Sequence, residues 1–139
     1  MDVQKQLLQA AKAALANAYA PYSEFSVGAA LQLNDGTIIQ GVNVENASYG
    51  LTNCAERSAL FAAYSQGYRQ QDIQMIAITT NQNHLISPCG ACRQVMLELL
   101  TADCPVILAN VDQSQHLELA CSDLLPHAFK NSDLINKNV

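Results

Sequence analysis

Ser87-Pro88-Cys89-Gly90-Ala91-Cys92-Arg93-Gln94 is the stretch of this sequence on which the interpretation of the whole chain depends. Its two cysteines are three positions apart, so on a helix they share one face with Cβ atoms about 5–6 Å apart. A helix that begins near Cys89 favours both thiolates through its free N–H groups and its positive dipole end. Pro88 suits such a start, because the N–H that proline lacks has no partner there.

A second motif, Asn53-Cys54-Ala55-Glu56-Arg57, supplies the expected third ligand of a zinc ion, Cys54. Thiolates bind zinc at about 2.3 Å, and three protein ligands leave the fourth tetrahedral position open, as in catalytic sites. Glu56 follows Cys54 by two residues, so it is expected to move protons to and from water at that position. This pattern predicts hydrolytic chemistry.

Alternatives remain for each of these residues. Unpaired cysteines are often buried as small hydrophobic residues, and Glu56 could be a surface carboxylate. A closed zinc site would need a fourth ligand, and the spare candidates stand outside any paired motif. We interpret these five as structural or surface residues: His84, Cys104, His116, Cys121 and His127.

Arg57 has a predicted electrostatic role. Three thiolates carry more negative charge than one Zn²⁺ neutralises, so the metal should be a weaker Lewis acid than one bound by histidines. Two helix N-termini would offset part of that charge, and Arg57 could donate hydrogen bonds to the cysteine ligands. The alternative is a solvated arginine on a helix face.

The composition limits the class of protein. A chain of 139 residues predicts a single domain, residues 1–139, that is large enough to bury a core. Only 14% of the residues are charged, against about 25% in typical domains, which favours surface hidden in an oligomer. The net charge of −5 and the scattering of the seven basic residues argue against nucleic-acid binding.

The cysteine count and the N-terminus predict a location. Five cysteines cannot all pair within one chain, and metal-ligand spacing outranks a disulfide interpretation in an intracellular protein. The first residues lack the pattern of a signal peptide. No apolar segment approaches the ~18 residues that span a bilayer, so we expect a cytoplasmic protein without membrane contact.

Periodicity predicts the secondary structure. Helices are expected over residues 3–19, 54–65 and 89–100, with a helical turn at 122–125; strands are expected over 26–33, 37–44, 73–80, 105–110 and 116–120. Asn34-Asp35-Gly36 is a hairpin turn signal, Asn53 is the expected N-cap of the second helix, and Gly67 is its expected stop. The polar tail after Asn131 is expected to be loosely held.

This order of elements indicates an α/β protein with a βαβ core and an antiparallel hairpin beside it. The second and third helices both follow strands, so their N-termini should meet at the carboxyl edge of the sheet. Open α/β sheets place ligands at that edge. The three cysteines should therefore come together there.

Cys54-Ala55-Glu56-Arg57 together with Pro88-Cys89-Gly90-Ala91-Cys92-Arg93-Gln94 resembles the small homotetrameric cytidine deaminases, which act on free nucleosides. The general pattern of a glutamate and a Pro-Cys-x-x-Cys motif is that of zinc deaminases. Many members have histidine as first ligand, and Cys54 matches the three-cysteine branch. The resemblance runs from Ala20 to Pro126.

The resemblance implies a three-layer α/β/α sandwich with a five-stranded mixed sheet and one Zn²⁺ per chain. It implies hydrolytic deamination of cytidine and deoxycytidine to uridine and deoxyuridine plus ammonia, in pyrimidine salvage. Glu56 would be the catalytic acid and base.

The resemblance also implies substrate contacts. Phe25 would pack against the pyrimidine, and Asn43 and Glu45 would hydrogen-bond the 3′-hydroxyl of the sugar. The backbone of Ala55 would let the base approach the metal closely. Without the resemblance, Phe25 is a core residue and Asn43 and Glu45 are loop polar residues.

Two further positions match intersubunit contacts of the family. Phe129 would reach the pyrimidine site of a neighbouring chain, and Tyr49 would lie at another interface of the homotetramer. The alternative makes Phe129 a local anchor for the tail.

Other functions would require other sequence features. A relative that acts on a nucleotide needs a cation at the 5′-phosphate, which Glu45 near the sugar would oppose, and a polymer-editing relative needs a basic groove. An antibiotic nucleoside is a further possible substrate. A structural zinc module for protein binding does not explain an open metal position beside Glu56. Loss of cytosine absorbance on incubation with cytidine separates these alternatives.

Overall fold

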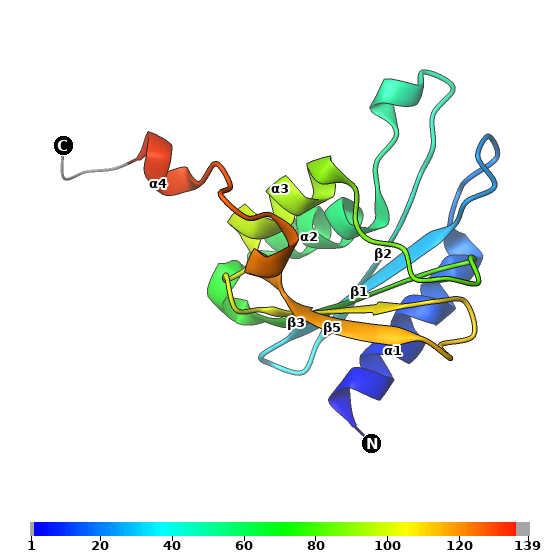
Figure 1. Cartoon of the computed structure of the whole chain (residues 1–139), viewed down its shortest axis with the longest axis horizontal. Coiled ribbons are helices and arrows are strands. Elements are labelled where there is room, and N and C mark those ends of the chain that lie inside the picture. Colours follow the sequence, from blue (N-terminus) through cyan, green and yellow to red (C-terminus); the bar gives the residue numbers. More distant parts are fainter. Residues whose placement is uncertain (1, 136–139) are drawn as a thin grey trace.

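The computed structural model describes residues 2–135, which form an α/β fold (Figure 1). Its elements are α1 (Val3–Ala14), β1 (Val27–Leu33), β2 (Ile38–Val42), α2 (Ala55–Ser65), β3 (Ile73–Thr80), α3 (Gly90–Leu99), β4 (Pro105–Ala109), β5 (His116–Ala120) and α4 (Asn131–Leu134). Short 3₁₀ turns lie at Leu15–Asn17, Tyr49–Leu51, Gln70–Asp72 and Cys121–Leu124. Within the described residues no helix is both long and apolar enough to cross a membrane.

The five strands form one mixed sheet in the order β2-β1-β3-β4-β5. β3 and β4 are parallel and are joined through α3, whereas the other neighbouring pairs are antiparallel. β2 runs in the same direction as β3, because each is antiparallel to β1. The pairs Gly28–Val42 and Val27–Thr80 place the carboxyl ends of β2 and β3 at one edge, as predicted.

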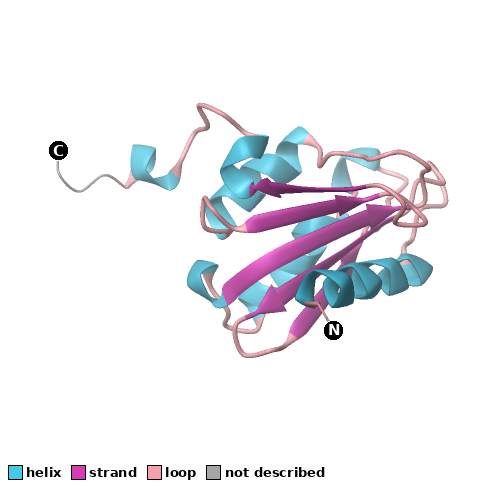
Figure 2. Ribbon diagram, turned by 60° about the horizontal axis from the view of Figure 1, so that its bottom comes forward, coloured by secondary structure: helices cyan, strands magenta, loops and turns pink. Residues whose placement is uncertain are grey.

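Helices cover both faces of the sheet, which confirms the three-layer sandwich. Figure 2 shows α1 against one face and the other long helices behind the sheet. The face toward α1 carries small side chains, among them Ala30, Ala77 and Ala109, which bury Leu7 of α1. Gly28 makes this approach possible, since a Cβ there would lie 2.2 Å from the carbonyl oxygen of Ala11.

The opposite face packs against α2 and α3 and holds the larger core. Leu31, Ile76 and Val106 of the sheet meet Leu60 of α2 and Met96 of α3, and all five side chains are fully buried. Burying side chains of this size contributes about 1.5–3 kcal/mol each. This layer therefore fixes the two helices that carry the cysteine motifs.

The start of each cysteine-bearing helix differs by one residue from its prediction. The N-cap of α2 is Cys54 and not Asn53, because the backbone of Asn53 pairs with Val44 and its side-chain amide donates to Ser58. The N-cap of α3 is Cys89, so Pro88 lies outside the helix and is not its first residue. Both cysteines thus occupy the same position relative to their helices.

Other predicted boundaries are confirmed or shifted slightly. β3 and β5 have the predicted bounds, and Gly36 and Gly67 adopt positive φ at the hairpin turn and after α2. The first helix ends at Ala14 and tightens into a 3₁₀ turn that ends at Asn17, short of residue 19. The tail, which we expect to be loosely held, contains the short helix α4 (Asn131–Leu134) that the sequence does not predict. Residues 136–139 of the tail lie outside the described residues.

Candidate active site

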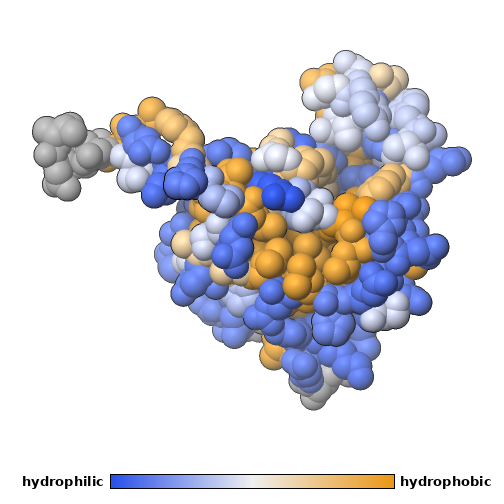
Figure 3. Space-filling model, in the orientation of Figure 1, coloured by the Kyte–Doolittle hydropathy of each residue, from blue (hydrophilic) through white to orange (hydrophobic). Residues whose placement is uncertain are grey.

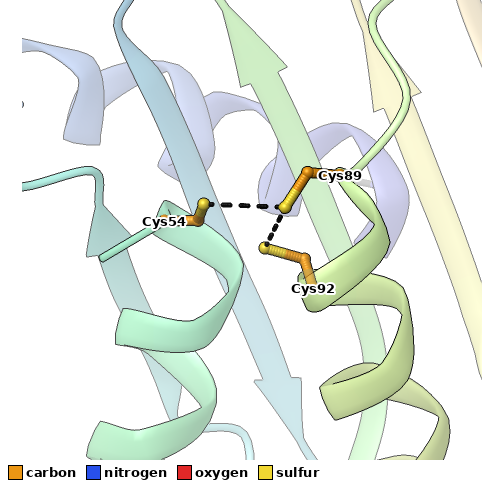
Figure 4. A group of neighbouring side chains, drawn as sticks. All are labelled: Cys54, Cys89 and Cys92. Carbon is orange, nitrogen blue, oxygen red and sulfur yellow. Dashed lines mark hydrogen bonds between the residues drawn. The ribbon is translucent and has the colours of Figure 1, made fainter. Parts of the chain in front are cut away.

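Cys54, Cys89 and Cys92 meet where α2 and α3 begin (Figure 4). The Sγ atoms of Cys54 and Cys89 are 3.9 Å apart, and those of Cys89 and Cys92 are 3.4 Å apart. All three sulfur atoms lie within 4.8 Å of one another. The two motifs, which are distant in the sequence, therefore form one cluster that can hold a metal ion.

The cluster fits tetrahedral zinc. Thiolates that bind at about 2.3 Å in a tetrahedron stand about 3.8 Å apart, close to the two measured separations. Cys54 and Cys89 are both N-caps with extended backbone, and neither sulfur accepts a capping hydrogen bond from the backbone of its helix. Both sulfurs also lie at the positive ends of helix dipoles, which favours the thiolate form that zinc requires.

The electrostatics of the cluster favour a thiolate at Cys54. Contact with Cys92 and the guanidinium of Arg57 lowers the pKa of Cys54 to about 5. Contact with Cys54 and burial raise the pKa of the Cys92 thiol. A thiolate and a thiol therefore lie side by side in the cluster.

Arg57 reaches the cluster from the first turn of α2. Its Nη2 donates to the Sγ of Cys54 at 3.2 Å, as the sequence predicts. This contact with Cys54 raises the pKa of Arg57 further above its ordinary value. The Nε of Arg57 is buried without a hydrogen-bond partner among the described residues. The guanidinium is therefore held at the sulfurs and not spread over the solvent face of the helix.

Glu56 lies beside the cluster and is 4% exposed. Burial is the main cause that raises its pKa to about 7. A carboxyl group with a pKa near neutrality can act as both acid and base at physiological pH. The position of Glu56 therefore fits proton transfer and not a surface carboxylate.

A cavity of about 570 Å³ opens over these residues, within the usual range for a small-molecule site. Its predicted lining residues are Phe25, Asn43, Glu45, Tyr49, Cys54, Glu56, Arg57 and Cys89. Two predicted substrate residues are absent from it within this chain. Ala55 is fully buried in the core, and the side chain of Phe129 is 57% exposed on the C-terminal segment.

Two polar residues that line the cavity, Asn43 and Glu45, also hold the backbone. The Nδ2 of Asn43 donates to the carbonyl oxygen of Phe25 at 2.7 Å, and its Oδ1 accepts from the N–H of Val27 at 2.9 Å. Glu45 accepts from the backbone N–H groups of Tyr22 and Ser23. Both side chains are buried, so Asn43 and Glu45 are not simply solvated polar residues of a loop.

Sequence reasoning missed about half of the cavity wall. The missed residues are Ser23, Val27, Gly50, Thr52, Ile78, Thr80, Ile86, Ser87 and Pro88. Ser87 and Pro88 belong to the stretch Ser87–Gln94 that carries Cys89 and Cys92, which is a usable signal. Ile78 and Thr80 read as ordinary strand residues, and only the pairing of β3 with β1 brings them to the cavity.

Phe129 lies on a segment that leaves the body of the molecule after Leu124. Figure 1 shows this segment and α4 extending away from the sheet. Gln94 of α3 donates to the backbone oxygen of Phe129 at 2.9 Å, while the phenyl ring remains exposed. The local-anchor alternative does not fit an exposed ring.

Comparisons with known proteins agree with this geometry. Residues 1–108 match the family model of the cytidine and deoxycytidylate deaminase zinc-binding region. A cytidine deaminase of Halalkalibacterium halodurans is 53% identical over 96% of this chain and 98% of its own length. A cytidine deaminase of Sporosarcina psychrophila is 46% identical over 96% of both chains.

Solved structures show the same fold. A crystal structure of cytidine deaminase from Burkholderia pseudomallei superposes with a TM-score of 0.87 at 53% identity, over 93% of this chain and 100% of that one. A crystal structure of cytidine deaminase from Mycobacterium tuberculosis superposes with a TM-score of 0.78 at 37% identity, over 93% and 98%.

Proposed function

Since this chain belongs to the cytidine and deoxycytidylate deaminase family, we propose that it hydrolyses cytidine and deoxycytidine to uridine and deoxyuridine, with release of ammonia. The observation that carries the proposal is the Cys54–Cys89–Cys92 cluster beside the buried Glu56 in one cavity. The relatives of similar length that carry the name cytidine deaminase support the choice of substrate.

Zn²⁺ bound by the three cysteines would act as a Lewis acid and lower the pKa of a bound water molecule, which makes this water a better nucleophile at neutral pH. Arg57 donates to Cys54 and withdraws negative charge from the thiolates. The two helix N-termini act in the same sense. These groups of the chain tune the cluster toward water activation.

Glu56 moves the protons of the reaction. It takes a proton from the attacking water while a bond forms between that oxygen and C4 of cytosine. It delivers this proton to N3. It then takes the second proton from the oxygen now bound to C4 and passes it to the amino group, so that the bond between C4 and this nitrogen breaks, ammonia leaves and a carbonyl remains at C4. One carboxyl group serves both stages because it is base first and acid afterwards.

The rest of the cavity orients the nucleoside. Phe25 packs against the pyrimidine. The ionised Glu45 accepts a hydrogen bond from the 3′-hydroxyl, and the side-chain amide of Asn43 donates one to it. The backbone at Ala55 lets the base approach the cluster. A carboxylate at the sugar disfavours a phosphate there, so free nucleosides are preferred over nucleotides.

The active unit is a homotetramer that works in pyrimidine salvage in the cytoplasm. Figure 3 shows an apolar area on the face between the C-terminal segment and the loop after β2. Large exposed apolar residues favour association between copies, and they include Tyr49, Leu51, Phe61 and Phe129. Phe129, which is exposed and does not line the cavity of its own chain, completes the pyrimidine site of a neighbour, and Tyr49 contributes at another interface.

The direct test incubates the purified protein with cytidine and follows the loss of cytosine absorbance and the appearance of ammonia. Activity that a zinc chelator abolishes and added Zn²⁺ restores supports the proposal. A zinc-loaded, folded protein that leaves cytidine and deoxycytidine unchanged would refute it.

A further inference from the structure

Ser23 lies in the loop between the turn at Leu15–Asn17 and β1, and it lines the cavity. Its hydroxyl donates a short hydrogen bond to Oε2 of Glu45. Its backbone N–H donates to Oε1 of the same carboxylate at 3.1 Å, and the N–H of Tyr22 donates to that oxygen at 3.0 Å. Three donors therefore fix the plane of the Glu45 carboxylate.

The same hydroxyl also holds Phe25. The backbone N–H of Phe25 donates to Oγ of Ser23 at 3.0 Å. One oxygen thus joins two residues that line the cavity, a carboxylate that can bind hydroxyl groups and an aromatic ring that can pack on a base. Removal of this oxygen would break both hydrogen bonds, the one to the Glu45 carboxylate and the one from the N–H of Phe25.

The backbone of this loop needs such restraints. Glu24, between Ser23 and Phe25, has a φ of 60°, a left-handed conformation that costs energy for a residue other than glycine. Asn81, directly after β3, restrains it by donating a hydrogen bond of 2.9 Å to the carbonyl oxygen of Glu24. The backbone N–H of Glu24 also donates to the carbonyl oxygen of Ala20 at 3.0 Å. Side-chain and backbone hydrogen bonds together therefore hold this conformation.

The hydrogen bonds that Glu45 already accepts show how many lone-pair positions of its carboxylate remain for a ligand. A carboxylate offers about four lone-pair positions, and Tyr22 and Ser23 use three of them. The remaining position is on Oε2, the oxygen that accepts from the Ser23 hydroxyl. The hydrogen bond from Ser23 also lowers the pKa of Glu45, so the group stays ionised as an acceptor.

We propose that Ser23 is a positioning residue for nucleoside binding, which aims the free lone pair of Glu45 at the 3′-hydroxyl of the sugar. This inference rests on the proposed function. In the cavity, Glu56 and the cysteines must face C4 of the base. The sugar is attached at N1, across the ring from C4, and so it points toward the polar group formed by Ser23, Asn43 and Glu45.

The test compares two substrates that differ in one group, 2′-deoxycytidine and 2′,3′-dideoxycytidine. Ser23→Ala should raise KM for deoxycytidine about tenfold, since hydrogen bonds to charged groups are the stronger class. Its kcat should change much less, because the bond serves ground state and transition state alike. On the dideoxynucleoside, the loss of kcat/KM should be several-fold smaller, since only the restraint on Phe25 then contributes.

Control variants separate positioning from loss of fold. Ser23→Thr keeps the hydroxyl and should restore the deoxycytidine KM, and Ser65→Ala, at the exposed end of α2, should change nothing. If Ser23→Ala does not fold, Ser23→Cys keeps the size with a weaker donor and should show the same substrate dependence.

An equal loss on both substrates would overturn the inference, because Ser23 would then act on the fold or on the base. Full activity of Ser23→Ala on deoxycytidine would overturn it as well. Failure of the unaltered, zinc-loaded enzyme on deoxycytidine would instead refute the proposed function, and this inference with it.

Discussion

Gly41→Ala tests how closely α2 must lie against the sheet. A Cβ at position 41 would stand 2.4 Å from the backbone nitrogen of Ala59 and 2.6 Å from the carbonyl oxygen of Ala55. The first of these is about 1 Å short of the 3.4 Å at which ordinary contact begins. Both atoms belong to the helix backbone, so neither can rotate away and α2 itself must move.

The expected cost follows from this overlap. Overpacking a well-packed core costs about 1–3 kcal/mol, and a clash with backbone belongs at the upper end of that range. With an unfolding entropy of about 2.1 cal/mol/K per residue, 3 kcal/mol lowers the Tm of a domain of this size by about 10 °C. The first turn of α2 carries Glu56, and a displacement of about 1 Å at a reacting group can cost about 10²-fold in turnover.

Thermal unfolding followed by circular dichroism, at equal protein concentration and equal zinc content, measures the first effect, and kcat/KM on cytidine measures the second. Gly50→Ala is the matched stability control, because a Cβ there meets open space, and its free energy of unfolding should change by no more than about 0.5 kcal/mol. A Gly41→Ala protein that has the same Tm and the same kcat/KM as the unaltered chain would refute the close packing of α2.

Three other changes test the site. Cys89→Ala should lose the zinc and melt at a lower temperature, because the metal links two helices; elemental analysis that finds full zinc would rule out this ligand set. Arg57→Ala should keep the zinc, lower kcat more than it raises KM, and raise the pH at which activity appears; an unchanged pH profile would leave Arg57 without an electrostatic role. Glu56→Ala and Phe129→Ala chains, unfolded together and refolded as a mixture, should exceed the mean activity of the two parents. No gain in proven mixed tetramers would mean that each cavity uses its own Phe129.

Much of the fold could be predicted because its signals are local. The bounds of β3 follow from an apolar run between polar segments, and the hairpin between β1 and β2 follows from Asn34-Asp35-Gly36. The N-cap of α2 could not be assigned, since Asn53 is a good cap by residue type and only its pairing with Val44 moves the helix start to Cys54.

Some residues of the candidate site could likewise be predicted from local motifs, and others could not. The cysteines and Glu56 were predicted because two short motifs place them at metal-ligand spacing. Ser23 and Thr80 were missed, because a serine in a turn and a threonine in a strand carry no sign of a cavity until the sheet pairs. Phe129 was predicted from family resemblance alone, and its position outside the cavity of its own chain makes its role a matter of assembly.

The most direct measurement of the central claim is the turnover of cytidine by zinc-loaded Glu56→Gln. This variant keeps the three cysteines and nearly the same shape, and removes only the group that moves protons. We expect one zinc per chain, an unchanged fold and a loss of kcat of at least about 10²–10⁴-fold. Near-normal turnover with full zinc would contradict this expectation.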